Sequence, residues 1–552
     1  MHLFYVLTLF CAVKAFDLLP RGRPANATDV KVITSPGGAT IRYKQPGGSG
    51  MCETMPGVNE YSGYVDLDNA THMFFIFVEA RKDPANAPLT LWLNGGPGSD
   101  SLIAFFQELG PCNVTKELKT QLNPYAWNEV SNMLFLSQPI GVGFSYSFKS
   151  SDSSGTYSEL DPAAAVGTTD QAAVAAWHVL QGFLANLPKL DSKITSKTFN
   201  LWTESYGGHY GPSFYSHFMD QNAAIANGTQ NGTQLVMDTL GIINGIIDEK
   251  IQAPYYPEFA VNNTYGIKAV NDTVYSQMKA AYYDPGQCRD KIDACSASAN
   301  KTSPDGLKNC RLAEAICRYK VEYPYYDVSG RGTYDIRYTG KEPDPPLYFV
   351  DFLNLDSTQN ALGVNMNYTS DSSDTVGVNF ELTGDFIFET MMDDLEDLLN
   401  KNVRVALFYG DADYICNWFG GEAVSMQVNY THSADFRAAP YSPFMVDNVE
   451  YGKVRQHGNF SFTRIYESGH EIPYYQPKAS LEFFRRALGK KAISDGFADV
   501  TTSYSTNGTS GTGDIQSSSS VSPSASSTGA AATASPSKSA GDRRIKMFWR
   551  WD

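Results

Sequence analysis

Short apolar runs that open directly onto glycine-rich turns are the feature that most constrains the fold of this chain. Residues 89–93 lead into a glycine turn at 94–98, and residues 133–136 lead into a second one. A helix-like stretch at 170–186 is followed by another short apolar run at 199–202. Apolar strands that alternate with helices are typical of parallel sheets with both faces buried. The sequence therefore predicts the α/β class, with a mostly parallel central sheet.

This alternation of strands and helices breaks once and ends before the C-terminus. Residues 245–384 are rich in Tyr, Pro and Asp and carry four cysteines, and strand-like sequence resumes after them. We predict a core in two parts, 16–244 and 385–490, with the intervening residues inserted as a cap. The last segment, 491–552, is rich in Ser, Thr, Gly, Ala and Pro, which predicts a disordered, O-glycosylated tail.

The first residues have the features of a secretory signal. An apolar run from Leu3 to Val13 ends at small residues in the positions that a signal peptidase reads, which predicts a cleaved signal peptide over 1–15. This run is too short to span a bilayer, and no other stretch reaches spanning length. Residues 542–552 are charged throughout, whereas a lipid-anchor signal needs a hydrophobic tail. We expect a secreted chain; a cell-wall or lipid-anchored form would need a different C-terminal sequence.

The composition bears on partners and location. The net charge is −16, with 43 basic and 59 acidic residues, and the chain offers no basic stripe, so we expect no nucleic-acid partner. Only 18% of the residues are charged, which favours N-linked glycans as the groups that keep the surface hydrated. Acceptor motifs occur at Asn26, Asn69, Asn113, Asn227, Asn231, Asn262, Asn271, Asn300, Asn367, Asn429, Asn459 and Asn507.

Cysteine spacing predicts a set of disulfides. Cys11 leaves with the signal, and the seven cysteines that remain predict three bridges and one free thiol, Cys416. The equal spacing within the two cysteine pairs of the cap favours a nested pairing, although an accidental spacing would leave other pairings open. The predicted bridges are Cys52–Cys112, Cys288–Cys317 and Cys295–Cys310.

A serine lies at the apex of the turn that follows the run at 199–202. Ser205 is followed by Tyr206 and then by two glycines, the pattern of a nucleophile elbow, in which small neighbours let Oγ project from the sheet. Thr203 replaces the first glycine of the G-x-S-x-G motif. On this motif alone, an ordinary Ser/Gly loop is an equally good interpretation.

A serine nucleophile needs a histidine that takes its proton and a carboxylate that orients the histidine. When these three residues occur in the chain order Ser, Asp, His, the aspartate commonly lies just after a late strand. Here a strand-like run leads to Asp411 and Asp413. Of the later histidines, His470 alone follows a fresh strand and lies in a glycine turn. We interpret His432 and His457 as surface or core histidines.

Five collinear blocks lie between residues 47 and 488: 93–98, 135–139 with 143–146, 204–206 with 208–210, 413–417, and 469–473. These blocks resemble the serine carboxypeptidase family, near the fungal secreted S-type and D-type enzymes. The resemblance implies an α/β-hydrolase fold with an inserted cap and no cofactor. It places the nucleophile at Ser205, the acid at Asp413 and the base at His470.

The resemblance also implies a binding site for a free C-terminus. It assigns the oxyanion hole to the N–H groups of Gly96 and Tyr206, and the terminal-carboxylate site to Asn94, Gly95, Glu108 and Glu204. Two neighbouring glutamates raise each other's pKa, so at acid pH they can donate hydrogen bonds to a carboxylate. Without the resemblance, Glu108 reads as a solvated acid at a helix end.

Specificity rests on fewer signals. By resemblance, Ile415, Cys416 and Tyr206 line the pocket for the side chain before the scissile bond. Glu471, directly after the base, places a carboxylate near the departing residue and favours Lys or Arg there. An exposed acid without a ligand role is the alternative interpretation of Glu471.

The sequence thus predicts a secreted serine-type carboxypeptidase that releases C-terminal amino acids from peptides and proteins at acid pH through an acyl-enzyme on Ser205. An acyltransferase on the same scaffold and a non-catalytic secreted or cell-wall protein are the alternatives. No HExxH or clustered Cys/His motif is present, which disfavours a metallocarboxypeptidase, and we expect no metal. The oligomeric state is not predicted.

Overall fold

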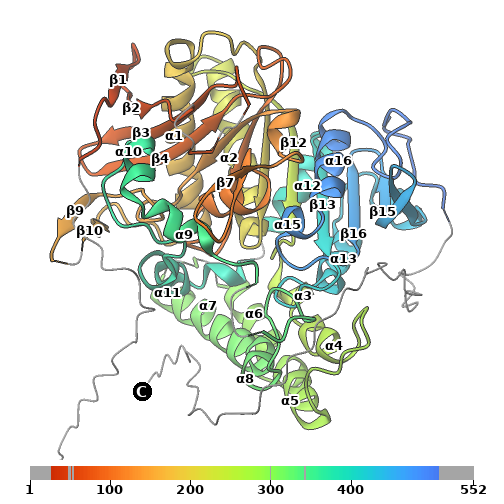
Figure 1. Ribbon diagram of the computed structural model, residues 1–552. Coiled ribbons are helices and arrows are strands. Elements are labelled where there is room, and N and C mark those ends of the chain that lie inside the picture. The colour runs from red at the N-terminus through yellow and green to blue at the C-terminus, as the bar shows by residue number, and fades with distance from the viewer. Residues whose placement is uncertain are drawn as a thin grey trace, which may run out of the picture. The chain divides into compact units, whose positions relative to one another are not determined.

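The computed structural model describes most of the chain between residues 26 and 508 (Figure 1). The described ranges are 26–47, 51–52, 55–153, 155–298, 300–301, 303–340, 344–388 and 390–508. The predicted signal peptide and the chain from residue 509 on lie outside these residues. Within the described ranges, no helix is long and apolar enough to cross a membrane.

In this part of the chain, twelve strands form one sheet. In their order across the sheet they are β1 (Lys31–Thr34), β2 (Thr40–Lys44), β3 (Glu60–Asp68), β4 (Thr71–Val78), β8 (Asn132–Leu136), β5 (Leu89–Leu93), β11 (Thr198–Glu204), β12 (Val236–Ile243), β13 (Arg404–Gly410), β16 (Phe460–Ile465), β15 (Val449–His457) and β14 (Ser442–Val446). The central strands from β8 to β16 run parallel, and the flanking strands pair antiparallel. The predicted α/β class with a mostly parallel centre is confirmed.

Helices and two small hairpins complete the described fold. The hairpins are β6 (Cys112–Val114) with β7 (Thr120–Leu122), and β9 (Phe148–Ser151) with β10 (Thr156–Glu159). The α-helices are α1 (Thr169–Leu190), α2 (Gly207–Ala226), α3 (Glu249–Gln252), α4 (Tyr255–Val261), α5 (Asp272–Tyr283), α6 (Cys288–Ser296), α7 (Pro304–Ile316), α8 (Pro324–Val328), α9 (Tyr348–Leu353), α10 (Asp356–Leu362), α11 (Val378–Thr383), α12 (Thr390–Asn400), α13 (Trp418–Gln427), α14 (Ser433–Ala438), α15 (Ile472–Tyr475) and α16 (Pro477–Leu488). Shorter or wider helical turns are η1 (Ala104–Glu108), η2 (Trp127–Glu129), η3 (Cys317–Glu322), η4 (Ser373–Gly377) and η5 (Asp385–Ile387).

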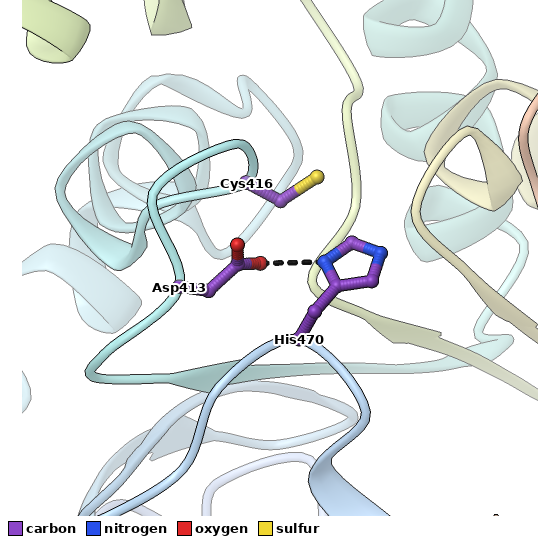
Figure 2. Close-up of side chains that lie close together, drawn as sticks. All are labelled: Asp413, Cys416 and His470. Atoms are coloured by element: carbon purple, nitrogen blue, oxygen red, sulfur yellow. Dashed lines mark hydrogen bonds and ion pairs between the residues drawn. The ribbon is translucent and has the colours of Figure 1, made fainter. Parts of the chain in front are cut away.

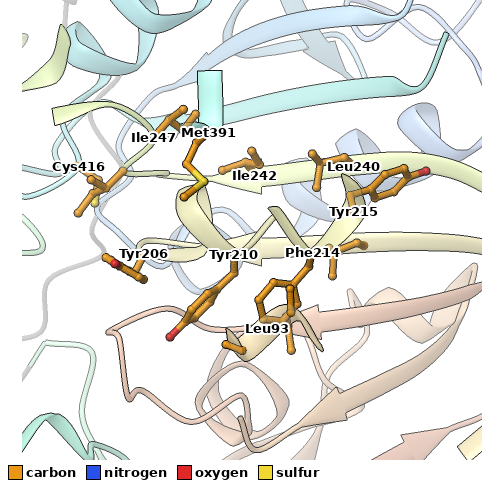
Figure 3. Close-up of a cluster of buried hydrophobic side chains, with 14 of the residues drawn as sticks. Leu93, Tyr206, Tyr210, Phe214, Tyr215, Leu240, Ile242, Ile247, Met391 and Cys416 are labelled. Carbon is orange, nitrogen blue, oxygen red and sulfur yellow. The ribbon is translucent and has the colours of Figure 1, made fainter. Parts of the chain in front are cut away.

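The two faces of the sheet bury separate cores. Successive residues of a strand point to opposite faces, so Leu201 and Trp202 of β11 join different hydrophobic clusters. Figure 3 shows the cluster that holds α2, where Phe214 lies with residues of β12. On the other face, Phe483 of α16 stacks on Phe408 of β13 with ring centroids 3.9 Å apart. The buried apolar side chains of the strands therefore hold helices against both faces of the sheet.

The segment between β12 and β13 contains helices and no strand among its described residues. Helices α3 to α8 and α11 gather below the sheet in Figure 1. Two disulfides, Cys288–Cys317 and Cys295–Cys310, tie α6, α7 and η3 together. The third, Cys52–Cys112, reaches β6, and Cys416 is a free, buried thiol. The predicted pairing of the cysteines is confirmed.

The packed chain extends beyond the predicted end of the core at residue 490. Ile493 is buried, and its N–H donates to the Gln456 side chain over 3.0 Å. The Thr506 hydroxyl donates to the Pro440 carbonyl over 2.6 Å. The predicted start of the disordered tail at 491 is therefore too early, because apolar residues continue to pack after α16 before the Ser/Thr-rich composition begins.

Candidate active site

The turn between β11 and α2 holds Ser205 in a backbone conformation that few residues adopt. Ser205 has a φ of 65°, in the left-handed region. Its N–H donates to the Ile243 carbonyl over 3.0 Å, and its carbonyl accepts from the Ile246 N–H over 2.9 Å. These bonds anchor the turn to the chain after β12, so the serine is held where strand passes into helix. This is the geometry that the elbow motif predicts.

Glycines around Ser205 leave no room for side chains. A Cβ on Gly95 would lie 2.3 Å from the Tyr206 nitrogen, and a Cβ on Gly207 would lie 2.5 Å from the Cβ of Thr203. Thr203, which replaces the first glycine of the motif, donates its hydroxyl proton to the Gly207 carbonyl over 2.8 Å. The threonine is therefore accommodated within the elbow by a bond to the first turn of α2.

His470 and Asp413 form a buried pair at the ends of β16 and β13 (Figure 2). His470 Nδ1 lies 2.7 Å from Asp413 Oδ2, and their side chains are 7% and 0% exposed. Burial opposes the charged imidazolium, but the charge and hydrogen bond of Asp413 outweigh it and raise the pKa of His470. Asp411 instead accepts a hydrogen bond from the Tyr265 hydroxyl over 2.5 Å. The structure thus pairs Asp413, not Asp411, with the histidine.

Asn244, which the sequence analysis did not select, connects the loops that carry this pair. Its side-chain amide donates to the carbonyls of His470 and Gly469, the latter over 3.2 Å, and its Oδ1 accepts from the Gly410 N–H over 2.8 Å. The His470 N–H donates to the Tyr334 carbonyl over 2.9 Å. One sequence feature could have identified Asn244: it lies directly after a buried strand, at the same edge of the sheet as the ends of β13 and β16.

The Cys416 thiol lies next to the His–Asp pair. Figure 2 shows it beside Asp413 and His470, with one ligand atom of each within 4.8 Å of the others. Burial and the charge of Asp413 raise its pKa, while a hydrogen-bonding contact with Ser205 opposes that increase. No direct hydrogen bond joins the described side chains of Ser205 and His470. Such bonds often tighten only when substrate binds.

Two backbone N–H groups at this edge have no described acceptor. They belong to Gly96, which has a φ of 107°, and to Tyr206, which precedes the first residue of α2. The close approach of Gly95 to Tyr206 brings the two turns together. The N-terminal end of a helix carries partial positive charge, so this location favours a developing negative charge.

Two buried glutamates share one asparagine next to the elbow. Asn94 Nδ2 donates to Glu204 over 3.0 Å and to Glu108 over 3.3 Å, while its Oδ1 accepts from the Trp92 indole over 2.7 Å. Both glutamates are 2% exposed. Burial and the charge of Glu204 raise the pKa of Glu108 well above its usual range. The interpretation of Glu108 as a solvated acid is therefore wrong, because η1 turns it inward.

Glu471 belongs to the same group of acids. It accepts a hydrogen bond from Gln107, which the sequence analysis missed, over 2.7 Å. Burial and the charge of Glu108 raise the pKa of Glu471 to about 8. Ile415 is half-buried in the loop after β13. The sheet, the turn after β11 and the His470–Asp413 pair together make the arrangement of an α/β-hydrolase.

Comparisons with known proteins agree with this class. Residues 46–490 match the family described as serine carboxypeptidase. The chain is 40% identical to carboxypeptidase S1 homolog B of Arthroderma otae, over 86% of this chain and 80% of the relative. It is 37% identical to carboxypeptidase S1 of Penicillium janthinellum, over 81% of this chain and 99% of the relative.

A solved structure shows the same fold. The structure of Kex1, a prohormone-processing carboxypeptidase of Saccharomyces cerevisiae, has a TM-score of 0.62 at 20% identity and covers 79% of this chain and 92% of its own. The chain belongs to the serine carboxypeptidase family. It is a serine-type peptide hydrolase with an α/β-hydrolase fold, and neither the acyltransferase nor the non-catalytic alternative is favoured.

Proposed function

We propose that the enzyme releases single amino acids from the C-termini of peptides and proteins through an acyl-enzyme on Ser205. His470 takes the hydroxyl proton as Oγ bonds to the scissile carbonyl carbon, and Asp413 stabilises the imidazolium that forms. The oxyanion accepts hydrogen bonds from the N–H groups of Gly96 and Tyr206. His470 then gives the proton to the departing amine as the C–N bond breaks, and water hydrolyses the ester by the same steps.

The observation that carries this proposal is the place of the buried acids. Glu204 directly precedes Ser205 in the chain, and it shares Asn94 with Glu108. A substrate carboxylate bound by these residues and by the Gly95 N–H would present the last peptide bond to the serine. Because burial keeps protons on the glutamates, they can donate to that carboxylate at acid pH. We therefore assign acid pH as the working condition.

We assign the substrate specificity of the enzyme to four pocket residues. Ile415, Cys416 and Tyr206 line the pocket for the residue before the scissile bond, and Glu471 faces the departing residue. With a pKa of about 8, Glu471 is neutral at acid pH, so a bound Lys or Arg must displace its proton.

We expect the preference for C-terminal Arg over Leu, measured as a ratio of kcat/KM values, to increase from pH 4 to pH 7. In Glu471→Gln that ratio should stay constant; a ratio equal to that of the unaltered enzyme at every pH removes Glu471 from specificity.

Secretion and N-linked glycosylation complete the proposal. The three disulfides fit an oxidising compartment. All twelve acceptor asparagines are described, and none of them is buried. Detection of the enzyme in culture medium, with a mass that falls on treatment with an N-glycosidase, tests both points. Retention in the vacuole, the location in the name of a 34% identical relative from S. cerevisiae, would contradict secretion.

The test of the activity compares a blocked dipeptide with its C-terminal amide at about pH 4–5, the range set by carboxyl pKa values. Release of the amino acid from the free acid, weaker action on the amide and loss of both in Ser205→Ala are expected. Equal action on acid and amide would contradict the carboxylate site. No release, despite labelling of Ser205 by an organophosphonate, would favour acyl transfer to an acceptor other than water.

A further inference from the structure

A second group of ligating side chains lies on the surface, far along the chain from Ser205. His432 precedes α14, Asp435 lies in its first turn, and His457 is the last residue of β15. His432 Nδ1 is 3.3 Å from Asp435 Oδ2, and His457 Nε2 is 3.8 Å from the same oxygen. One ligand atom from each residue lies within 4.8 Å of the others.

These separations are close to those of a coordination sphere. Zinc binds imidazole nitrogen and carboxylate oxygen at about 2.0–2.1 Å, so neighbouring ligand atoms of a tetrahedral site are about 3.3 Å apart. His432 and Asp435 already have that spacing, and His457 Nε2 lies only slightly farther from the same Asp435 oxygen. Two imidazoles and one carboxylate are ligands suited to Zn²⁺, Co²⁺ and Ni²⁺.

His457 supplies an independent indication of a ligand. Its side chain is only 10% exposed, and its buried Nδ1 has no hydrogen-bond partner among the described residues, while Nε2 faces Asp435. Buried polar atoms nearly always have a partner, so a ring in this state is poised to bind something. The ring also lines a surface hollow of about 130 Å³, together with His432, Thr431 and Thr502.

We propose that His432, Asp435 and His457 form a binding site for a divalent transition-metal ion. The bound ion is Zn²⁺, and a water molecule occupies its fourth coordination position. The ion joins the first turn of α14 to the end of β15. Its role is structural, since the site shares no residue with the proposed catalytic group.

Equilibrium dialysis with Zn²⁺ tests the site, using the full chain and the variants Asp435→Asn, His457→Gln and His432→Gln. The unaltered protein should bind one ion at this site, and each variant should bind it at least about 10- to 100-fold more weakly, because loss of an outer-shell partner alone costs that much. Asp435 is 60% exposed, so its amide variant should keep the fold even if a histidine variant does not. His178→Gln, at an exposed histidine of α1, is the matched control and should bind as the unaltered protein does.

The other cluster of ligating groups, Asp413, Cys416 and His470, must be separated from this one. Cys416→Ser should leave one ion bound with unchanged affinity. Co²⁺ should give visible bands without the near-ultraviolet charge transfer of a thiolate ligand, and those bands should disappear in Asp435→Asn. Unchanged Zn²⁺ affinity in Asp435→Asn and His457→Gln, the absence of saturable binding, or loss of the ion in Cys416→Ser alone would each overturn the proposal.

Discussion

Two buried carboxyl sites lie at the same edge of the sheet, and their surroundings give them opposite states. Asp413 faces His470, whose imidazolium can neutralise its charge. Glu108 and Glu204 face each other and share only the neutral amide of Asn94. All three side chains are buried and their pKa values are raised, chiefly by burial. The partner therefore decides whether a buried acid works as a charge or as a hydrogen-bond donor.

Removing the charge of Asp413 should have the largest effect. In Asp413→Asn the side chain keeps its shape, but the amide no longer stabilises an imidazolium on His470. We expect kcat to fall on the order of 10⁴-fold with little change in KM. Steady-state kinetics on a blocked dipeptide measure both quantities, and Asp411→Asn is the matched control. An equal loss in the two variants would mean that the pair shown in Figure 2 is not the working one.

Glu108→Gln should separate binding from chemistry. As pH rises through the raised pKa values of the two glutamates, a second negative charge develops beside the substrate carboxylate and KM should increase on the order of tenfold. The glutamine cannot ionise, so the increase in KM should be smaller, with kcat little changed. A pH series of KM measures this, with the exposed Glu117→Gln as control. KM that is flat from acid to neutral pH in the unaltered enzyme would refute the neutral pair.

Asn244 is a positioning residue, so its loss should affect the His–Asp pair and leave the glutamate pair alone. In Asn244→Ala the carbonyls of His470 and Gly469 lose their donor, and the base loop loosens. We expect kcat to fall on the order of tenfold or more, because the variant loses three hydrogen bonds that each contribute about 0.5–1.5 kcal/mol. KM and its pH dependence should stay unchanged. A variant in which KM alone rises would place Asn244 at substrate binding instead.

The smallest effect concerns stability rather than rate. Burial raises the pKa of Asp100 to about 6 and that of Asp411 to about 7. In both groups the folded-state pKa lies above the unfolded value near 4. The stability that these two protonated carboxyl groups contribute is therefore fully present below about pH 4 and is lost as pH rises through 6 to 7. We expect Tm to fall by a few degrees between pH 5 and 8.

Asp100→Asn cannot ionise and should flatten that fall in Tm, whereas the exposed Asp220→Asn should not. Calorimetry or circular dichroism across the pH range measures it. A Tm that increases from pH 5 to 8 in the unaltered enzyme would show that the buried acids do not dominate its pH stability.

Sequence patterns predicted more of the fold than of the contacts. The strands, the elbow at Ser205 and the three disulfides followed from short-range periodicity, glycine turns and spacing. The end of the packed chain was missed, because residues after 490 are short of apolar periodicity and are held by bonds to distant partners such as Gln456. Gln107 was missed for the same reason, since its partner Glu471 is far away in sequence.

The sequence by itself determined which local elements form and which chemistry they can carry: a serine on a tight turn, acids after strands and a histidine in a glycine loop. Those features depend on neighbouring residues, and backbone sterics and hydrogen-bonding rules act over a few positions. Only the tertiary structure decided that Asp413 faces His470, that Glu108 turns inward to Glu204, and that the two surface histidines meet Asp435. Such meetings depend on strand order and side-chain packing between segments far apart in the chain, which no local pattern encodes.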